Sequence, residues 1–530
     1  MKRYSLLLVL VIGLVAPIFT PSCTNLEEEV FSELTDANFP SSRAELIAGF
    51  GAAYANLYSF GSHNTYLSAQ EVSSDEMMIP QRGGDWFDGG IWLRCHRHEM
   101  LPTDGYIDNA WNDMYRGVGF SNNLIQVFKG LIGDPESPVT DEEASLFVAE
   151  LRGLRALYYY WLMDLYGNIP LVTDVEEGEA LDPVPANNER AEVYAFLVAE
   201  LEEIRGSLLT GKDANTYARF TQTAADMLLA KLYLNAAVYS GSAQWAQAQT
   251  AVDRVINSGL YSLTNDYFEN FNADNDNGGV GTSENIFVIP YDAVNAPGFN
   301  LPQMTLHYSS NATFDLQEQP WNGYCSLQEF YNSYEDGDAR KGVSGNQQVR
   351  GNFYAGAQFA SDGVTPLTDG AVEADDPDGE NIIFTPEINE HFPNALRQAG
   401  VRVGKYEYEI GNTRHLNSDF PVFRYADALL MKAEALWQQD NGSQEALDLV
   451  NQIRTRAGVA ELGSLTADEL LAERGREMFY EAWRRSDLIR FGKFGDEWDF
   501  KPASASGKEL FPIPQNKINV NPNLRQNPSY

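Results

Sequence analysis

Apolar side chains recur every three or four residues between about residues 144 and 258, which is the spacing of one face of an α-helix. The pattern predicts four successive helices. The first is expected to end at Gly167, the third to begin after Thr221 as its N-cap, and the fourth to end at Gly259. The four apolar faces consist of Phe147, Leu151, Leu154, Tyr158, Trp161, Leu162 and Leu165; Val193, Leu197, Leu201 and Ile204; Ala225, Leu228, Leu232 and Ala236; and Trp245, Val252, Val255 and Ile256.

A second helical block is predicted near the C-terminus. One helix passes through Ala428–Leu436, a turn follows at Asn441–Gly442, and another helix passes through Ala446–Ala457. Thr466–Glu469 has the pattern of a capping box, in which a threonine and a glutamate three residues later satisfy each other's backbone amides. We therefore expect a long helix that begins there and continues through Trp483.

The two helical blocks, at about 40–258 and 420–495, consist of helix pairs that resemble tetratricopeptide units. The intervening segment, about 260–420, differs in composition. It contains acidic, glycine-rich stretches such as Asp274–Gly279 and a short strand-like run at Ile286–Ile289. The sequence predicts a mainly α fold with a loop-rich, short-strand insertion, and binding surfaces are often placed on such loops.

The composition narrows the class of protein. The chain has 530 residues, 44% of them hydrophobic, so it can form a sizeable core and is not a disordered or low-complexity chain. Lys and Arg number 37 against 75 Asp and Glu, which gives a net charge of −38. This balance argues against a nucleic-acid partner, because phosphate backbones are held by clustered basic side chains.

The N-terminus has the features of an export signal. Lys2 and Arg3 precede an apolar stretch, Leu6–Phe19, that is too short to span a membrane but suits a signal peptide. Cys23 follows directly, so residues 1–22 resemble a lipoprotein signal and Cys23 is the expected lipidation site; plain secretion is the alternative. Removal of the two basic residues with this leader changes the net charge to −40. No later stretch is apolar enough for a spanning helix.

Motifs for catalysis or metal binding are missing from the sequence. It contains no G-x-S-x-G, no phosphate-binding loop and no H-E-x-x-H. The two remaining cysteines, Cys95 and Cys325, form no C-x-x-C motif, and His96 with His98 would supply only two metal ligands. Asp274–Gly279 faintly resembles a calcium loop, and structural calcium or a solvated loop are the alternatives there. We expect neither a resident metal nor another cofactor.

Several dispersed segments together resemble the SusD/RagB family of outer-membrane nutrient-binding lipoproteins. The resemblance implies a largely helical fold with about four tetratricopeptide-like helix pairs, no catalytic activity, and a partner: a SusC-like, TonB-dependent outer-membrane barrel. Ligands of the family are usually oligosaccharides, and peptides in one branch. The segments that carry the resemblance are Leu154–Tyr160, Leu165–Val172, Ala224–Asn235, Phe423–Asp427, Glu473–Gly492, Phe511–Pro514 and Asn521–Tyr530.

The charged segment Glu473–Arg490 is interpreted as structural, because the resemblance implies this pattern whatever the ligand. Within it, Glu481 and Arg485 lie four residues apart, and such a pair stabilises a helix by a few tenths of a kcal/mol.

Aromatic residues outside the helical faces are the better candidates for ligand contact. A sugar presents apolar C–H faces and a rim of hydroxyls, so its binding surface needs exposed rings beside polar groups. Two loops have this composition, and burial of their rings as loop anchors is the alternative. The candidate glycan-binding residues are Asp85, Trp86 and Trp92 in one loop and Trp321, Asn322 and Tyr324 in the other, with Asp75 and Arg82 as further hydrogen-bonding groups.

These observations predict one SusD-like domain over residues 23–530, held at the outer surface of the cell by the lipid on Cys23. It is expected to capture oligosaccharides and deliver them to the barrel. The high negative charge favours neutral glycans over polyanionic ones. The alternatives are peptide capture, a secreted glycoside hydrolase, and a helical scaffold that binds only other proteins.

Overall fold

The computed structural model describes residues 42–173, 184–370 and 379–530. The predicted signal peptide and Cys23 lie outside these residues. The chain divides into two compact units, Met1–Ile47 and Ala48–Tyr530, and everything described below belongs to the second. Helix α2 (Arg43–Ala55) contains the boundary between them.

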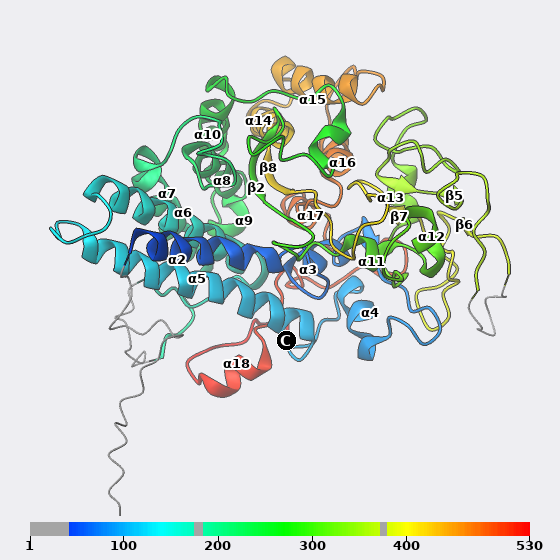
Figure 1. Ribbon diagram of the computed structural model, residues 1–530, viewed down its shortest axis with the longest axis horizontal. Coiled ribbons are helices and arrows are strands. Elements are labelled where there is room, and N and C mark those ends of the chain that lie inside the picture. Colours follow the sequence, from blue (N-terminus) through cyan, green and yellow to red (C-terminus); the bar gives the residue numbers. More distant parts are fainter. Residues whose placement is uncertain (1–41, 174–183, 371–378) are drawn as a thin grey trace, which may run out of the picture. The chain divides into compact units, whose positions relative to one another are not determined.

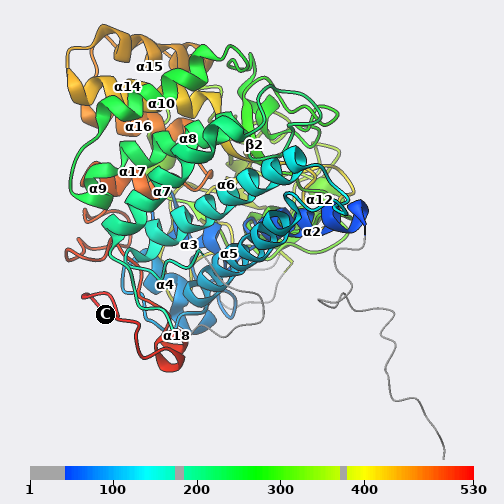
Figure 2. The ribbon, with the colours of Figure 1, turned by 90° about the vertical axis from the view of Figure 1, so that its left-hand side faces the viewer.

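The scaffold of the second unit is a succession of packed helices (Figures 1 and 2). Each of the seven helices named in the next sentence packs against the one that follows it there, and Figure 2 shows this succession from α5 to α15. They are α5 (Gly105–Leu131), α6 (Asp141–Tyr166), α7 (Arg190–Ile204), α8 (Gln222–Leu234), α10 (Trp245–Asn257), α14 (Tyr425–Gln439) and α15 (Gln444–Arg456). The predicted mainly α fold is confirmed, while the grouping into about four tetratricopeptide-like pairs stays a prediction.

Helix ends follow the local signals in the sequence. Thr140 and Thr466 form capping boxes at the starts of α6 and α16 (Ala467–Met478), and the Thr221 hydroxyl accepts a hydrogen bond from the backbone of α8. Gly117 in α5 allows the close approach of α6, because a Cβ there would lie 2.3 Å from the Tyr158 ring. Capping and small residues therefore fix both the lengths and the spacing of the helices.

Shorter helices flank this scaffold. They are α3 (Tyr66–Val72), α4 (Ile91–His96), α9 (Ala236–Ser240), α17 (Arg484–Arg490) and α18 (Gln515–Val520).

A membrane-spanning helix, which would have to be both long and apolar, does not occur within the described ranges. Both remaining cysteines, Cys95 and Cys325, are buried and free.

The described part of residues 260–424 contains only elements of five residues or fewer, joined by loops (Figure 1). The strands form antiparallel pairs: β2 with β8, β4 with β7 and β5 with β6 pair within this part, and β3 pairs with β1, which comes much earlier in the chain. The strands are β1 (Met77–Met78), β2 (Asn285–Ile289), β3 (Cys325–Ser326), β4 (Phe353–Tyr354), β5 (Gly356–Ala357), β6 (Ile383–Phe384), β7 (Arg402–Val403) and β8 (Phe420–Arg424), and the helices are α11 (Leu301–Thr305), α12 (Asn311–Phe314) and α13 (Gln328–Asn332).

The long helix expected from Thr466 through Trp483 is wrong. It ends at Met478, and Tyr480 and Ala482 have φ values of 55° and 64° before α17 begins. The backbone amides freed by this break donate to two buried carboxylates, from Tyr480 to Glu76 (3.1 Å) and from Ala482 to Glu71 (2.7 Å). Long-range hydrogen bonds replace the helical ones, and periodicity along the chain cannot reveal them.

The charged segment is structural, and its charges are buried. Glu477 is fully buried and forms ion pairs with Arg340 (3.0 Å), Arg424 (2.6 Å) and Arg456. These guanidinium groups hold the pKa of Glu477 below its usual range despite the opposing effect of burial. The predicted pair of Glu481 with its neighbour four residues on does not form, because Glu481 pairs with Arg424 instead (2.7 Å).

Arg485, the other member of that predicted pair, forms an ion pair with Asp164 in α6 (3.0 Å).

The two carboxyl groups at the helix break, Glu71 and Glu76, have raised pKa values, in contrast to Glu477. Burial raises the pKa of Glu71 to about 7 and that of Glu76 well above its usual value, and the nearby Glu71 carboxyl raises the pKa of Glu76 further. The segment thus joins the scaffold to the loop region through buried ion pairs and through backbone hydrogen bonds to two buried carboxyl groups.

Candidate functional site

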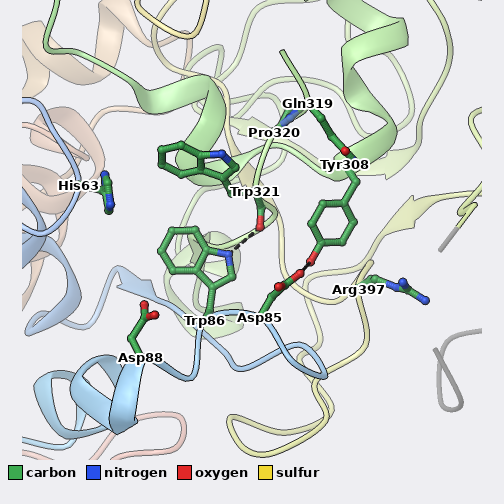
Figure 3. A pocket seen from close by; sticks show the side chains of 9 residues that line it. All are labelled: His63, Asp85, Trp86, Asp88, Tyr308, Gln319, Pro320, Trp321 and Arg397. Carbon is green, nitrogen blue, oxygen red and sulfur yellow. Dashed lines mark hydrogen bonds between the residues drawn. The ribbon is translucent and has the colours of Figure 1, made fainter. Parts of the chain in front are cut away.

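The candidate site is a cavity of about 830 Å³ between the loop after β1 and the segment that follows α12 (Figure 3). Trp86 and Trp321 lie beside each other in it, with ring centroids 6.4 Å apart and ring planes inclined by 52°. Both rings are partly exposed. The cavity is lined by His63, Asp85, Trp86, Asp88, Tyr308, Gln319, Pro320, Trp321 and Arg397.

The conformation of Trp86 is set by its surroundings. Its φ of 62° lies in the left-handed region, which a non-glycine residue adopts only when tertiary contacts enforce it. The indole Nε1 donates to the carbonyl oxygen of Trp321 (2.6 Å), and the ring packs edge-on against Tyr324 at 5.8 Å. Gly323 makes room for it, since a Cβ there would lie 2.3 Å from the indole. The two tryptophans are therefore held together before any ligand arrives.

The second tryptophan is fixed from the other side. The backbone amide of Trp321 donates to the carbonyl of Gln303 (2.8 Å), and its ring meets His63 at 5.0 Å with the planes inclined by 71°. Burial lowers the pKa of His63, the attraction of Asp88 notwithstanding, so the imidazole is neutral at neutral pH. The imidazole therefore adds an uncharged ring that meets the Trp321 indole edge-on.

Polar groups border the two indole rings. The hydroxyl of Tyr308 donates to the exposed carboxylate of Asp85. The pKa of this hydroxyl is raised, mainly by burial and further by the neighbouring carboxylate. The guanidinium of Arg397 lies on the same side of the cavity in Figure 3 and pairs with Asp369 (3.0 Å). Gln319 is exposed at the rim. The cavity thus offers ring faces together with an exposed carboxylate and an exposed amide, while the guanidinium at its wall is paired with Asp369.

The structure brings together three of the six predicted glycan contacts, Asp85, Trp86 and Trp321. The prediction that the other three contact the ligand is wrong, because Trp92, Asn322 and Tyr324 are at most 1% exposed. Trp92 stacks on Tyr106, the hydroxyl of Tyr324 bonds Ser68 (2.6 Å), and the Asn322 amide donates to the carbonyl of Arg397 (2.9 Å). They anchor the loops that hold the site.

The two further hydrogen-bonding candidates are likewise occupied within the protein. Asp75 forms a two-point ion pair with Arg484 at 2.6 and 2.7 Å. Arg82 is buried, and its guanidinium donates to backbone carbonyls, among them that of Ala399 (2.8 Å). Neither lines the cavity.

Sequence reasoning missed His63, Tyr308, Gln319 and Arg397. Each is far along the chain from the tryptophan loops or carries no local signal of its own, and only the folded loops bring them together. Within the described residues, no group of three or more His, Cys, Asp or Glu side chains is placed to hold a metal ion.

Both halves of the chain match models of known protein families. The model of the SusD family matches residues 283–530, and a model described as starch-binding associating with outer membrane matches residues 26–234. The starch-binding protein SusD of Bacteroides thetaiotaomicron is 29% identical over 435 residues, which is 75% of this chain and 75% of that protein. The SusD-like protein P2 of Formosa agariphila is 26% identical over the whole of both chains.

Solved structures share the fold. A SusD superfamily protein of Parabacteroides distasonis has a TM-score of 0.72 at 21% identity, over 94% of this chain and all of that one. The surface glycan-binding protein A of Bacteroides thetaiotaomicron, solved in complex with laminarihexaose, has a TM-score of 0.70 at 23% identity, over 92% of this chain and all of that one.

Proposed function

Because the chain belongs to the SusD family, we propose that it binds a neutral oligosaccharide in the cavity formed around Trp86 and Trp321. The observation that carries this proposal is the pair of partly exposed indole rings, fixed by an internal hydrogen bond and bordered by polar side chains. Sugars bind to such surfaces because their C–H faces pack on rings while their hydroxyls bond to the polar rim. Two relatives named for starch or surface glycan binding support the same ligand class.

The expected affinity is modest. Ring contacts contribute about 0.5–1.5 kcal/mol each beyond the area that they bury, and net hydrogen bonds contribute about as much. Two ring contacts with a few hydrogen bonds correspond to a dissociation constant between about 1 μM and 1 mM. Such an affinity suits a protein that captures a ligand and then releases it.

A neutral ligand fits the charge better than a polyanion does. The whole chain carries a net charge of −38, and the cavity presents the carboxylates of Asp85 and Asp88. Its one lining guanidinium, that of Arg397, is engaged by Asp369. A polyanionic glycan would meet repulsion without a cation to offset it.

We further propose that the protein is a surface lipoprotein of the outer membrane, anchored through Cys23, which delivers its ligand to a TonB-dependent, SusC-like barrel. The cysteine directly after the apolar leader supports the anchor, and the family description, starch-binding associating with outer membrane, supports the location. Metabolic labelling with a radioactive fatty acid tests the anchor: wild type should be labelled and a Cys23→Ala variant should not. Co-purification of a barrel from the native membrane tests the partner.

The proposed binding is tested with the mature protein against immobilised starch, laminarin, other neutral polysaccharides and a polyanionic control. We expect retardation by at least one neutral glycan and no increase in reducing ends over a day. Release of reducing ends would indicate a hydrolase instead. Retention of a peptide panel with no glycan retained would favour the peptide-binding alternative, and retention of neither would contradict the proposal.

A further inference from the structure

A second cavity, of about 920 Å³, has a different chemical character from the tryptophan-lined one. It is formed by the 3-10 helix η1 (Asn56–Ser59), the loop after the 3-10 helix η4 (Tyr267–Phe271), the turn after β2, and the segment that precedes β8. It shares none of its lining residues with the first cavity. Its carboxylates belong to Asp274, Asp276, Asp292, Glu407, Glu409 and Asp419.

The fixed charges around this cavity are strongly unbalanced. Six of its lining residues are acids, and none of them is a lysine or arginine. Arg350 approaches from outside, 3.7 Å from Glu407. Asp292 accepts hydrogen bonds from two backbone amides (2.9 and 2.6 Å), which lower its pKa and keep it charged. The negative potential is therefore a lasting property of the cavity.

One of these acids has a buried oxygen without a hydrogen-bond partner among the described residues. Asp419 is only 3% exposed, and its Oδ1 accepts a hydrogen bond from the backbone amide of Tyr291 (3.0 Å). Its Oδ2 is buried and has no hydrogen-bond partner among the described residues. Burial raises the pKa of this carboxyl to about 7. A buried carboxylate oxygen without a partner is costly, and a cationic donor in the cavity would satisfy it.

Aromatic rings accompany the carboxylates. Tyr58 and Tyr217 line the cavity and are partly exposed, and the Tyr217 hydroxyl is a further buried group without a partner among the described residues. Ammonium groups bind to the faces of tyrosine rings as well as to carboxylates. Rings and acids in one cavity therefore match an organic cation.

We propose that this cavity is a second binding site that takes a small molecule with two or more primary ammonium groups. The dispersion of the carboxylates favours such a ligand over a single ion, because in the described part of the chain no three acidic side chains are placed to hold a metal. The volume also exceeds what one ion needs. An amino-sugar oligomer and an aliphatic polyamine share this chemistry.

The test is isothermal titration calorimetry on the full mature protein at pH 6.5 and low salt. The probes are glucosamine tetramer, spermidine, N-acetylglucosamine tetramer as the uncharged counterpart, and calcium chloride. We expect one or both amines to bind, with affinity that falls as salt rises, while the acetylated tetramer gives no signal that depends on this cavity. Which amine binds identifies the source of the ammonium groups.

Two variants place the binding in this cavity. Asp274→Asn combined with Asp276→Asn removes two charges from the cavity rim, and should weaken amine binding about tenfold while leaving neutral glycan retention unchanged. Asp419→Asn should weaken it less, because a carboxyl with a pKa of about 7 is only partly ionised at pH 6.5. The matched control, Glu136→Gln with Glu142→Gln, removes two exposed acids elsewhere and should leave the affinity within about twofold.

The proposal is overturned if neither amine binds, if only calcium binds, or if the acetylated tetramer binds here as well as the amine. Equal amine affinity in the wild type and in the Asp274→Asn/Asp276→Asn variant would also overturn it. Because neutral glycan retention is measured on the same samples, failure at this cavity is distinguished from failure of the tryptophan site.

Discussion

Replacing Trp86 by alanine removes one of the two rings proposed to contact the sugar, and it also releases the other. The indole Nε1 of Trp86 donates to the Trp321 carbonyl at 2.6 Å, and the two ring centroids are 6.4 Å apart. The loss of the ring contact costs about 0.5–1.5 kcal/mol of binding free energy. Loss of the hydrogen bond that orients Trp321 adds up to about as much. Their sum, about 0.5–3 kcal/mol, predicts a roughly 2- to 150-fold larger dissociation constant.

Trp86→Phe and Trp321→Ala separate the two effects. The phenylalanine keeps a ring face but lacks the donor, so its loss of affinity should be intermediate. Because the two tryptophans act as a unit, the double alanine variant should lose less than the sum of the single losses, by about 0.5–1 kcal/mol. Calorimetric titration with the best-retained neutral oligosaccharide measures all four proteins.

A matched control guards against general destabilisation. Trp437 in α14 is also partly exposed, and its Nε1 donates to the carbonyl of Leu465 (3.0 Å). Trp437→Ala therefore removes the same kind of ring and hydrogen bond away from the cavity, and it should leave glycan affinity unchanged. If Trp86→Ala and Trp321→Ala are folded and bind as tightly as wild type, the assignment of these rings to the site is refuted.

Three further predictions follow from the packing and the buried charges. Gly323→Ala brings a Cβ to 2.3 Å from the Trp86 ring and should cost about 1–3 kcal/mol in urea unfolding and weaken glycan binding, whereas Gly84→Ala, which enters open space, should do neither. Glu71 has a pKa of about 7 in the folded protein and an ordinary pKa in the unfolded chain, so the free energy of unfolding falls as the pH rises from about 4.5 to about 7. In the same urea unfolding assay, Glu71→Gln should be as stable as wild type at pH 5 and more stable by roughly 2 kcal/mol at pH 8. An equal dependence on pH in both proteins would contradict this. Glu477→Gln leaves buried guanidinium groups without their carboxylate and should lower the free energy of unfolding by about 3–5 kcal/mol; a loss below about 1 kcal/mol would refute that role.

The helical scaffold could be predicted from the sequence because its signals are local. Thr221 and Thr466 cap the helices that they were expected to cap, and Gly167 follows the last residue of α6. The break after Met478 could not be predicted in this way. It depends on Glu71 and Glu76, some four hundred residues away, which accept hydrogen bonds from its backbone.

The binding site could be predicted only in part for the same reason. Loop composition drew attention to Trp86 and Trp321, both of which line the cavity, but it also drew attention to Trp92. Which indole is exposed depends on tertiary contacts, here the stacking of Trp92 on Tyr106. His63 reaches the cavity from another part of the chain and carries no motif. Local composition therefore finds the right loops, and only the fold selects the side chains.

A crystal structure of the protein with the neutral oligosaccharide that it retains best tests the central claim most directly. We expect a sugar ring packed on the exposed faces of Trp86 and Trp321, with hydroxyls within hydrogen-bonding distance of Asp85, Gln319 or Arg397. An oligosaccharide bound elsewhere on the protein, with no sugar between the two tryptophan loops, would contradict it.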